Sequence, residues 1–246
     1  MKVIILAAGY ATRLYPLTKN LPKALLPIGE KTILDLLLQK VAEISDVSSV
    51  TLVTNHKFAA VFDAYFRKLK NEFLPWQIKV LDDGTGEESI RLGALGDLKL
   101  ALNQLGYEED VLVLASDNLF EFSLRQAYLT FKSLKKDMVV GQSLESCDEL
   151  SRFAIAEVDA GGIITSLEEK PANPKSNIVV YATYFYKAET LPLLLQYESE
   201  GNNMDSPGRF PAWLYKRKPI YLYRIEGKCI DIGTVESYAA IKDTWQ

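Results

Sequence analysis

Hydrophobic and polar positions along the first half of the chain follow two alternating periods. Short apolar runs, such as KVIIL at residues 2–6, predict buried strands, while apolar residues recurring every three or four positions predict amphipathic helices. The expected strands cover residues 2–6, 49–54, 78–83 and 110–117, and the expected helices cover residues 32–44, 58–73, 93–105 and 124–134. Strands that alternate with helices form β-α-β units, so we expect an α/β fold with a mostly parallel sheet covered by helices on both faces.

The second half of the chain is richer in strands. Strand patterns cover residues 137–144, 153–171, 178–189 and 220–227, and shorter helical patterns cover residues 190–198, 211–218 and 235–245. The turn at residues 160–162 predicts a hairpin within the second of these strand segments. No linker, low-complexity tract or internal repeat divides the chain, so we expect one domain spanning residues 1–246.

Composition narrows the function classes. The chain has 246 residues, of which 48% are apolar, and its net charge of −4 argues against nucleic acid as a partner. No run approaches the ~20 apolar residues of a membrane span, and the first apolar run is too short for a signal sequence, so we expect a cytoplasmic protein with no membrane partner. Cys147 and Cys229 are expected to be core residues. His56 is the only histidine, which excludes a multi-histidine metal site and suits a surface hydrogen-bonding role.

The segment LAAGYATRLYPLTKNLPKALLPIG, at residues 6–29, carries the first candidate chemistry. It leaves the first strand at the edge where open α/β sheets bind ligands, and it contains Arg13, Lys19 and Lys23 between stiffening prolines. It matches neither the P-loop nor the dinucleotide-binding pattern. From the residues alone it is either an anion-binding loop or a solvated basic loop.

This loop resembles the signature of the sugar-1-phosphate nucleotidylyltransferases, the family of glucose-1-phosphate thymidylyltransferase. The matching residues are Gly9, Thr12, Arg13, Leu14, Pro16, Leu17, Thr18, Pro22, Lys23 and Pro27. Ala11 stands where the pattern has glycine. Three further stretches agree: VLVLASDNLF at 111–120, with Ser116 in place of glycine, EEKP at 168–171, and IDIGTVESY at 230–238.

The resemblance covers nearly the whole chain and implies a fold of the nucleotide-diphospho-sugar transferase type. That fold has a Rossmann-like mixed sheet flanked by helices and a smaller, strand-rich acceptor lobe. The implied nucleotide-binding half covers residues 1–120 and the acceptor-binding half covers residues 121–246, approximately. The implied reaction joins a nucleoside triphosphate to a sugar 1-phosphate, with Mg²⁺ as cofactor, and gives a nucleotide sugar and pyrophosphate. A homo-oligomer is possible by family likeness.

The resemblance assigns roles residue by residue. Arg13 and Lys23 are the expected catalytic residues, which hold the triphosphate. Asp117 and Asp231 are the expected Mg²⁺ ligands. From the residues alone, Asp117 could equally be the cap of a following helix, and Asp231 could be part of a turn or a cap. The expected nucleotide-binding residues are Ala8, Gly9, Asp83 and Gly93, and the expected acceptor-binding residues are Asn118, Glu169 and Lys170.

The substrates stay open at this stage. Asp82 or Asp83 could accept a hydrogen bond from a base, or could shape a hairpin-like loop, so UTP, dTTP and CTP all fit. Arg209 and the aromatic residues near it could line the acceptor side or a subunit interface. A cytidylyltransferase acting on a phosphate such as phosphocholine, and a regulatory subunit without activity, are the alternatives. A regulatory subunit without activity is expected to have lost Arg13, Lys23 or one of the two aspartates, but this chain has all of these residues.

Overall fold

The computed structural model describes residues 1–69, 76, 78–144 and 150–245. Contacts divide the chain into two compact units. The first unit contains residues 1–92, 114–125 and 227–246, and the second contains residues 93–113 and 126–226. The expectation for Cys147 lies outside the described residues. That the chain works as one domain, with a nucleotide half and an acceptor half, stays a prediction.

The first unit is built on parallel strands. Strand β4 (Ser49–Thr54) pairs with both β1 (Lys2–Leu6) and β5 (Ile78–Asp82), all in the same direction. The central residues of β1 and β4 are buried, as the apolar runs predict. Strand β6 (Val111–Ala115) enters this unit at its end, where the N–H of Ser116 donates to the carbonyl of Leu6. The carboxyl ends of these strands therefore lead into the predicted ligand-binding loops.

Polar residues at the ends of strands and loops start the helices of the first unit. Thr32 and Asp35 form a capping box at the start of α1 (Ile33–Val41), and the side chain of Asn55 accepts from the N–H of Phe58 at the start of α2 (His56–Lys68). The predicted helices at 32–44 and 58–73 are thus confirmed in their centres, while residues 70–75 lie outside the described residues.

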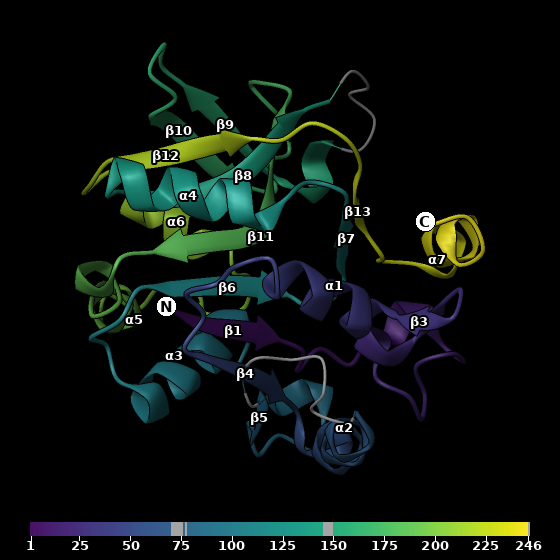
Figure 1. Ribbon diagram of the computed structural model, residues 1–246. Helices are drawn as coiled ribbons and strands as arrows, with labels where there is room; N and C mark the ends of the chain where they lie inside the picture. Colours follow the sequence, from purple (N-terminus) through teal and green to yellow (C-terminus); the bar gives the residue numbers. More distant parts are fainter. Residues whose placement is uncertain (70–75, 77, 145–149, 246) are drawn as a thin grey trace. The chain divides into compact units, whose positions relative to one another are not determined.

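Two short ladders complete the first unit. Strand β7 (Asn118–Phe120) pairs antiparallel with β13 (Cys229–Asp231), and the two lie next to each other in Figure 1, with α7 (Val235–Ile241) following β13. Strand β2 (Pro27–Ile28) pairs with β3 (Lys31–Thr32). The sequence pattern predicted neither ladder, because strands of two or three residues are too short to show a period.

The second unit is a mixed sheet with helices. Strand β11 runs antiparallel to both β8 and β9, β9 pairs antiparallel with β10, and β12 runs parallel to β8. These strands span Asp137–Ser143 (β8), Ala154–Val158 (β9), Ile164–Glu169 (β10), Ile178–Tyr186 (β11) and Ile220–Arg224 (β12). The predicted hairpin at residues 160–162 is confirmed between β9 and β10, where the Asp159 carboxylate accepts from the N–H groups of Gly161 and Ile163.

In the second unit the helix predicted at residues 124–134 is confirmed, whereas the helices predicted at 190–198 and 211–218 are shorter than the sequence predicts. They are α3 (Ala94–Leu105), α4 (Leu124–Leu134, whose first two residues belong to the first unit), α5 (Leu193–Ser199) and α6 (Arg209–Leu214). The expected helix at 190–198 begins at Leu193, with a 3₁₀ turn before it, because Pro192 is tolerated at a helix start and not in its interior.

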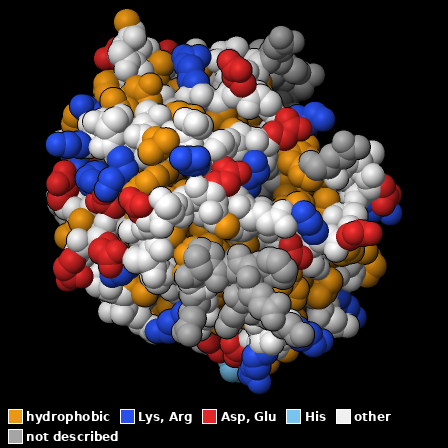
Figure 2. Space-filling model, viewed as in Figure 1, with side chains coloured by type: hydrophobic (Ala, Val, Ile, Leu, Met, Phe, Trp, Pro, Cys, Tyr) orange, Lys and Arg blue, Asp and Glu red, His pale blue; other side chains and the backbone are white. Residues whose placement is uncertain are grey.

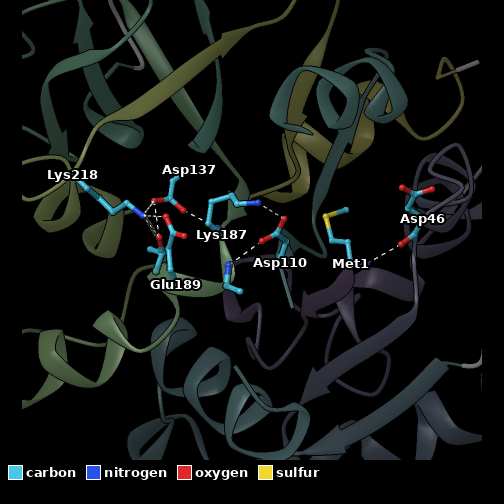
Figure 3. A network of polar contacts seen from close by, with 9 residues as sticks. Met1, Asp46, Asp110, Asp137, Lys187, Glu189 and Lys218 are labelled. Carbon is cyan, nitrogen blue, oxygen red and sulfur yellow. Dashed lines mark hydrogen bonds and ion pairs between the residues drawn. The ribbon is translucent and has the colours of Figure 1, made fainter. Parts of the chain in front are cut away.

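An ionic network built around the buried Asp137 joins four segments of the second unit (Figure 3). Asp137, at the start of β8, is fully buried and accepts from the N–H of Lys187, the hydroxyl of Thr190 and the ammonium of Lys218, the last at 2.9 Å. The ammonium of Lys187 in turn contacts Asp110 at 2.5 Å. Each buried charge therefore has a partner, as burial of charge requires.

These features confirm the predicted fold class, a mixed parallel and antiparallel sheet flanked by helices. Among the described residues, no helix is both long enough and apolar enough to span a bilayer. Figure 2 shows acidic and basic side chains interspersed over the face in view, in keeping with the small net charge.

Candidate functional site

The loop after β1 is an ordered structure rather than a flexible connection. Residues Thr12–Leu14 and Lys23–Leu25 form 3₁₀ turns, and the fully buried hydroxyl of Thr18 donates to the carbonyl of Ala11. Ala11 has the left-handed conformation, with φ 49° and ψ 42°, which glycine adopts at no steric cost. This explains why the resembling pattern has glycine here, and it means that the chain holds Ala11 under local strain.

Lys23 brings the loop into contact with both predicted metal ligands. Its ammonium lies 2.7 Å from an oxygen of Asp117 and 3.8 Å from an oxygen of Asp231, and the lysine side chain is only 13% exposed. Asp117 and Asp231 are 114 positions apart in the sequence, but the β7–β13 ladder begins directly beside them and the N–H of Ile232 donates to the carbonyl of Asp117. The fold therefore places one cation against two carboxylates.

A single hydrophobic cluster supports all four predicted residues. Leu14 follows Arg13, Leu26 lies three positions after Lys23, Leu119 lies two after Asp117, and Ile232 follows Asp231. These four apolar side chains are buried together with Ile28, Ile33, Tyr238 and Ile241. Because each of these candidate residues stands beside an anchored one, its backbone position is set by core packing. Arg13 itself is exposed, with no ion pair to another described residue.

The cap interpretations of the two aspartates do not hold. Asp117 precedes strand β7, and no described helix begins beside it. Helix α7, which follows Asp231, is capped by Thr234, whose hydroxyl accepts from the N–H of Ser237. Burial, and then the nearby carboxylates of Asp231 and Asp117, raise the pKa of the Cys229 thiol. Asp117 is half-buried and Asp231 is exposed, and both contact the Lys23 ammonium, so the two carboxylates offer oxygen ligands of the kind that a hard cation prefers.

The predicted nucleotide-binding residues of the first unit lie at the ends of β1 and β5. Ala8 is buried, and its carbonyl accepts from the side-chain amide of the fully buried Asn55 at 2.8 Å. Gly9 is exposed, and a side chain added there would meet nothing within 4 Å. Sequence reasoning missed Asn55, although an asparagine directly after a buried strand is a usable signal.

The acidic loop after β5 is held by its own side chains. One oxygen of Asp83 accepts from both the N–H and the hydroxyl of Thr85, at 2.7 Å each, and the carbonyl of Thr85 accepts from the hydroxyl of Tyr10. Burial alone would raise the pKa of the Asp82 carboxyl, but hydrogen bonds with His56 and Gly84 lower it overall. Asp83 thus shapes the loop, and contact between Asp83 and a base stays a prediction.

Gly93 belongs to the second unit and precedes α3. It has φ +79°, and the N–H groups of the next two residues donate to the carbonyls of Asp205 and Met204, at 2.9 Å each. A β-carbon at Gly93 would lie 2.6 Å from the Asp205 α-carbon and from the Met204 carbonyl oxygen. The glycine is therefore required by packing, and its role in nucleotide binding stays a prediction.

Glu169 and Lys170 lie together at the end of β10 in the second unit. Burial raises the pKa of the Glu169 carboxyl, and the positive charges of Lys170 and Arg209 offset part of this effect. A β-carbon at Gly208 would overlap the Glu169 carboxylate, and the negative charge of Glu169 adds to the burial that raises the pKa of the Tyr184 hydroxyl. Gly208, Arg209 and Tyr184 therefore surround Glu169.

The backbone at Lys170 is also unusual. Its φ of 49° is left-handed, which a lysine adopts only when the surrounding structure holds it, and its N–H donates to the carbonyl of Phe153. Asn118, the third predicted acceptor residue, is 5% exposed and lines a cavity of about 350 Å³ in the first unit, together with residues of α1 and Trp245. Its contact with an acceptor stays a prediction.

Known proteins match this chain over the residues that form the candidate site. The family model described as nucleotidyl transferase matches residues 2–246. A glucose-1-phosphate adenylyltransferase of Desulfitobacterium hafniense is 27% identical over 96% of this chain and 61% of its own length. The bifunctional protein GlmU of Methanocaldococcus jannaschii is 30% identical over 79% of this chain and 42% of its own length. The chain thus spans about three fifths or less of these curated relatives.

A solved UDP-glucose pyrophosphorylase from Acinetobacter baumanii has the same fold. It superposes with a TM-score of 0.80 over 98% of this chain and 91% of its own, at 18% sequence identity. Because the family model covers the strand-edge loop, both candidate metal ligands and the Glu-Lys-Pro turn, the match includes every segment that carries the resemblance. The chain belongs to the nucleotidyl transferase family.

Proposed function

We propose that this protein transfers a nucleotidyl group from a nucleoside triphosphate to a sugar 1-phosphate. The products are a nucleotide sugar and pyrophosphate. The observation that carries the proposal is the contact of Lys23 with both Asp117 and Asp231, since it joins the cationic loop to an acid pair. The family match and the name of the Desulfitobacterium relative, a glucose-1-phosphate adenylyltransferase, support the same reaction class.

The reaction is a displacement at the α-phosphorus. An oxygen of the acceptor phosphate forms a bond to the α-phosphorus, the bond to the β-phosphate oxygen breaks, and its electron pair leaves with pyrophosphate. The attacking phosphate is already ionised, so no general base is needed. The task of the protein is to orient two anions that repel each other and to stabilise negative charge on the leaving group.

The first unit supplies the groups for the triphosphate. Asp117 and Asp231 would hold Mg²⁺, because carboxylate oxygens are the ligands that this ion prefers and one cation already contacts both side chains. Bound Mg²⁺ would supply Lewis-acid polarisation of the phosphates. Lys23 would donate hydrogen bonds to the α-phosphate, and the exposed guanidinium of Arg13 would hold the β- and γ-phosphates with its planar fork.

The second unit supplies the groups for the acceptor. Lys170 would bind the acceptor phosphate, and Glu169 would accept a hydrogen bond from a sugar hydroxyl. Tyr184 and Arg209, which influence Glu169 electrostatically, would flank the same ligand. A carboxylate that is largely withdrawn from water and lies beside buried tyrosine suits a neutral polyol, because hydroxyl donors recover the hydrogen bonds that burial removes.

A pyrophosphate-release screen tests this proposal. Purified protein with Mg²⁺ is mixed with each of UTP, dTTP, CTP, ATP and GTP, and with a panel of hexose 1-phosphates and phosphocholine, and products are identified by mass spectrometry. We expect one nucleotide and one sugar 1-phosphate to give a nucleotide sugar with equal release of pyrophosphate. Turnover of phosphocholine alone would replace the proposal with the cytidylyltransferase alternative, and no turnover with any pair would overturn it.

A further inference from the structure

The side chain of Lys23 contacts both candidate metal ligands directly. A lysine whose role is to bind the α-phosphate lies instead against the two carboxylates, at 2.7 Å from Asp117 and 3.8 Å from Asp231. We propose that Lys23 is the resident counter-cation of this acid pair, and that a divalent cation occupies the pair only when a polyphosphate draws the ammonium away. This inference rests on the proposed function, since it assumes the same site.

The acid pair needs a counter-charge. Asp117 and Asp231 are held close together by the β7–β13 ladder, and their side chains are 31% and 47% exposed. Two carboxylates that share one position repel each other unless a cation lies between them. The hydrogen bond from Lys23 to Asp117 supplies that cation from within the chain, so the geometry of the pair is kept without metal.

Lys23 is anchored at its backbone and mobile only along its side chain. The 3₁₀ turn Lys23–Leu25 is closed by backbone hydrogen bonds, from Leu25 to the carbonyl of Pro22 and from Leu26 to the carbonyl of Lys23, and Ala24 and Leu25 are buried. The four-carbon stem allows the ammonium to move by rotation of its own bonds. The ammonium can therefore exchange the carboxylates for a phosphate while the loop stays in place.

The ammonium and a divalent cation compete for the same oxygens. Mg²⁺ binds carboxylate oxygens at about 2.0–2.1 Å and loses its water reluctantly. An ammonium in hydrogen-bond contact with Asp117 occupies the approach to that oxygen. A metal ion that arrives alone must displace Lys23 without offering it a new partner, whereas a metal ion that arrives with a polyphosphate provides the anion that receives Lys23.

The inference makes metal binding and polyphosphate binding interdependent. In the wild type, inorganic tripolyphosphate should strengthen the binding of metal by withdrawing Lys23 from the acid pair. In a variant without the ammonium, the acid pair should bind metal on its own, and tripolyphosphate should strengthen metal binding by a smaller factor than in the wild type. Linkage requires the same factor for the effect of metal on tripolyphosphate binding.

Titration of Mn²⁺ into the nucleotide-free protein, followed by the electron paramagnetic resonance signal of free Mn²⁺, tests the counter-cation role of Lys23 without an activity measurement. Because tripolyphosphate itself binds Mn²⁺, the Mn²⁺ bound to protein in its presence is measured by equilibrium dialysis against the same tripolyphosphate solution without protein. The variant Lys23→Met removes the charge and keeps the length of the side chain, and Lys23→Gln is the second variant should Lys23→Met fold poorly. Lys19→Met is the matched control, because Lys19 is an exposed cation in the same loop. Circular dichroism checks the fold of each variant.

We expect Lys23→Met to bind Mn²⁺ about tenfold more tightly than the wild type or Lys19→Met, as loss of a competing charge-assisted hydrogen bond implies. Adding Asp117→Asn to Lys23→Met should abolish this gain. If Lys23→Met and Lys23→Gln bind Mn²⁺ no more tightly than the wild type, while the wild type binds it with tripolyphosphate, the counter-cation role is overturned and the metal site stands. If neither the wild type nor any variant binds Mn²⁺ under any condition, both the counter-cation role of Lys23 and the proposed metal site are overturned.

Discussion

Replacement of Gly93 by alanine should destabilise the protein strongly, because of the backbone conformation at this position and the atoms packed against it. At φ +79° and ψ 161°, Gly93 lies in a region of backbone conformation that is essentially restricted to glycine, and forcing another residue into it costs about 1–3 kcal/mol. The new β-carbon would also lie 2.6 Å from backbone atoms of Met204 and Asp205, which cannot rotate away as a flexible side chain could.

Relief of that overlap would break local hydrogen bonds. If the Met204–Asp205 segment shifts, the carbonyls that accept from Ala94 and Leu95 move with it, and each lost hydrogen bond costs about 0.5–1.5 kcal/mol. We therefore expect Gly93→Ala to lower the free energy of unfolding by about 2–6 kcal/mol in total. Urea unfolding followed by circular dichroism measures this loss.

Two other glycines separate the cost of the backbone conformation from the cost of the steric overlap. Gly84 has φ +77° but open space around it, so Gly84→Ala should show the backbone cost alone, about 1 kcal/mol. Gly86 has neither a positive φ nor a neighbour within 4 Å, so Gly86→Ala should change stability by less than about 0.5 kcal/mol. A loss for Gly93→Ala no greater than that for Gly84→Ala would refute the packing argument.

Two further changes test the second unit. Lys218→Met should leave the fully buried Asp137 without its main counter-charge and lower the free energy of unfolding in urea by about 3 kcal/mol. The control Lys216→Met, which removes an exposed cation, should lower it by almost nothing. Equal losses for the two variants would contradict the stabilising role of the network. Glu169→Gln should alter the pH dependence of stability. Because burial raises the folded-state pKa of Glu169 above its unfolded value, the wild type should lose stability relative to this variant as pH rises from the usual glutamate range through the raised pKa, and the difference should then level off. Parallel pH profiles of the two proteins between about pH 4 and 8 would show that this pKa is not raised.

The strands and helices of the chain were largely predictable from the sequence because their signals are local. A run such as residues 2–6 has a buried strand's composition, and the spacing of apolar residues indicates the helices α1 and α2. The cap of α2, Asn55, was missed, so that this helix was predicted to begin two residues too late. The predicted ends of helices were less accurate near prolines; for example, the helix predicted from residue 190 begins only after Pro192. The hairpin between β9 and β10 was also predictable, since its turn is set by neighbouring residues.

The candidate site was predictable in its members but not in its contacts. The motif resemblance selects Lys23, Asp117 and Asp231, but no local pattern shows that a ladder between β7 and β13 brings residues more than 110 positions apart together. Side-chain partners were equally hidden. Asp83 proved to bond Thr85, and Gly208 proved to make room for Glu169, because such contacts depend on tertiary packing.

Pyrophosphate release by Asp117→Asn and Asp231→Asn, measured in a single turnover with the substrate pair that the screen identifies, tests most directly whether this acid pair supports nucleotidyl transfer. The control is Asp243→Asn, because Asp243 is an acid 79% exposed to solvent and outside the pair. We expect each pair variant to lose rate by about 10²–10³-fold while melting like the wild type, and the control to keep full activity. Release at the wild-type rate by either pair variant would contradict the proposed site.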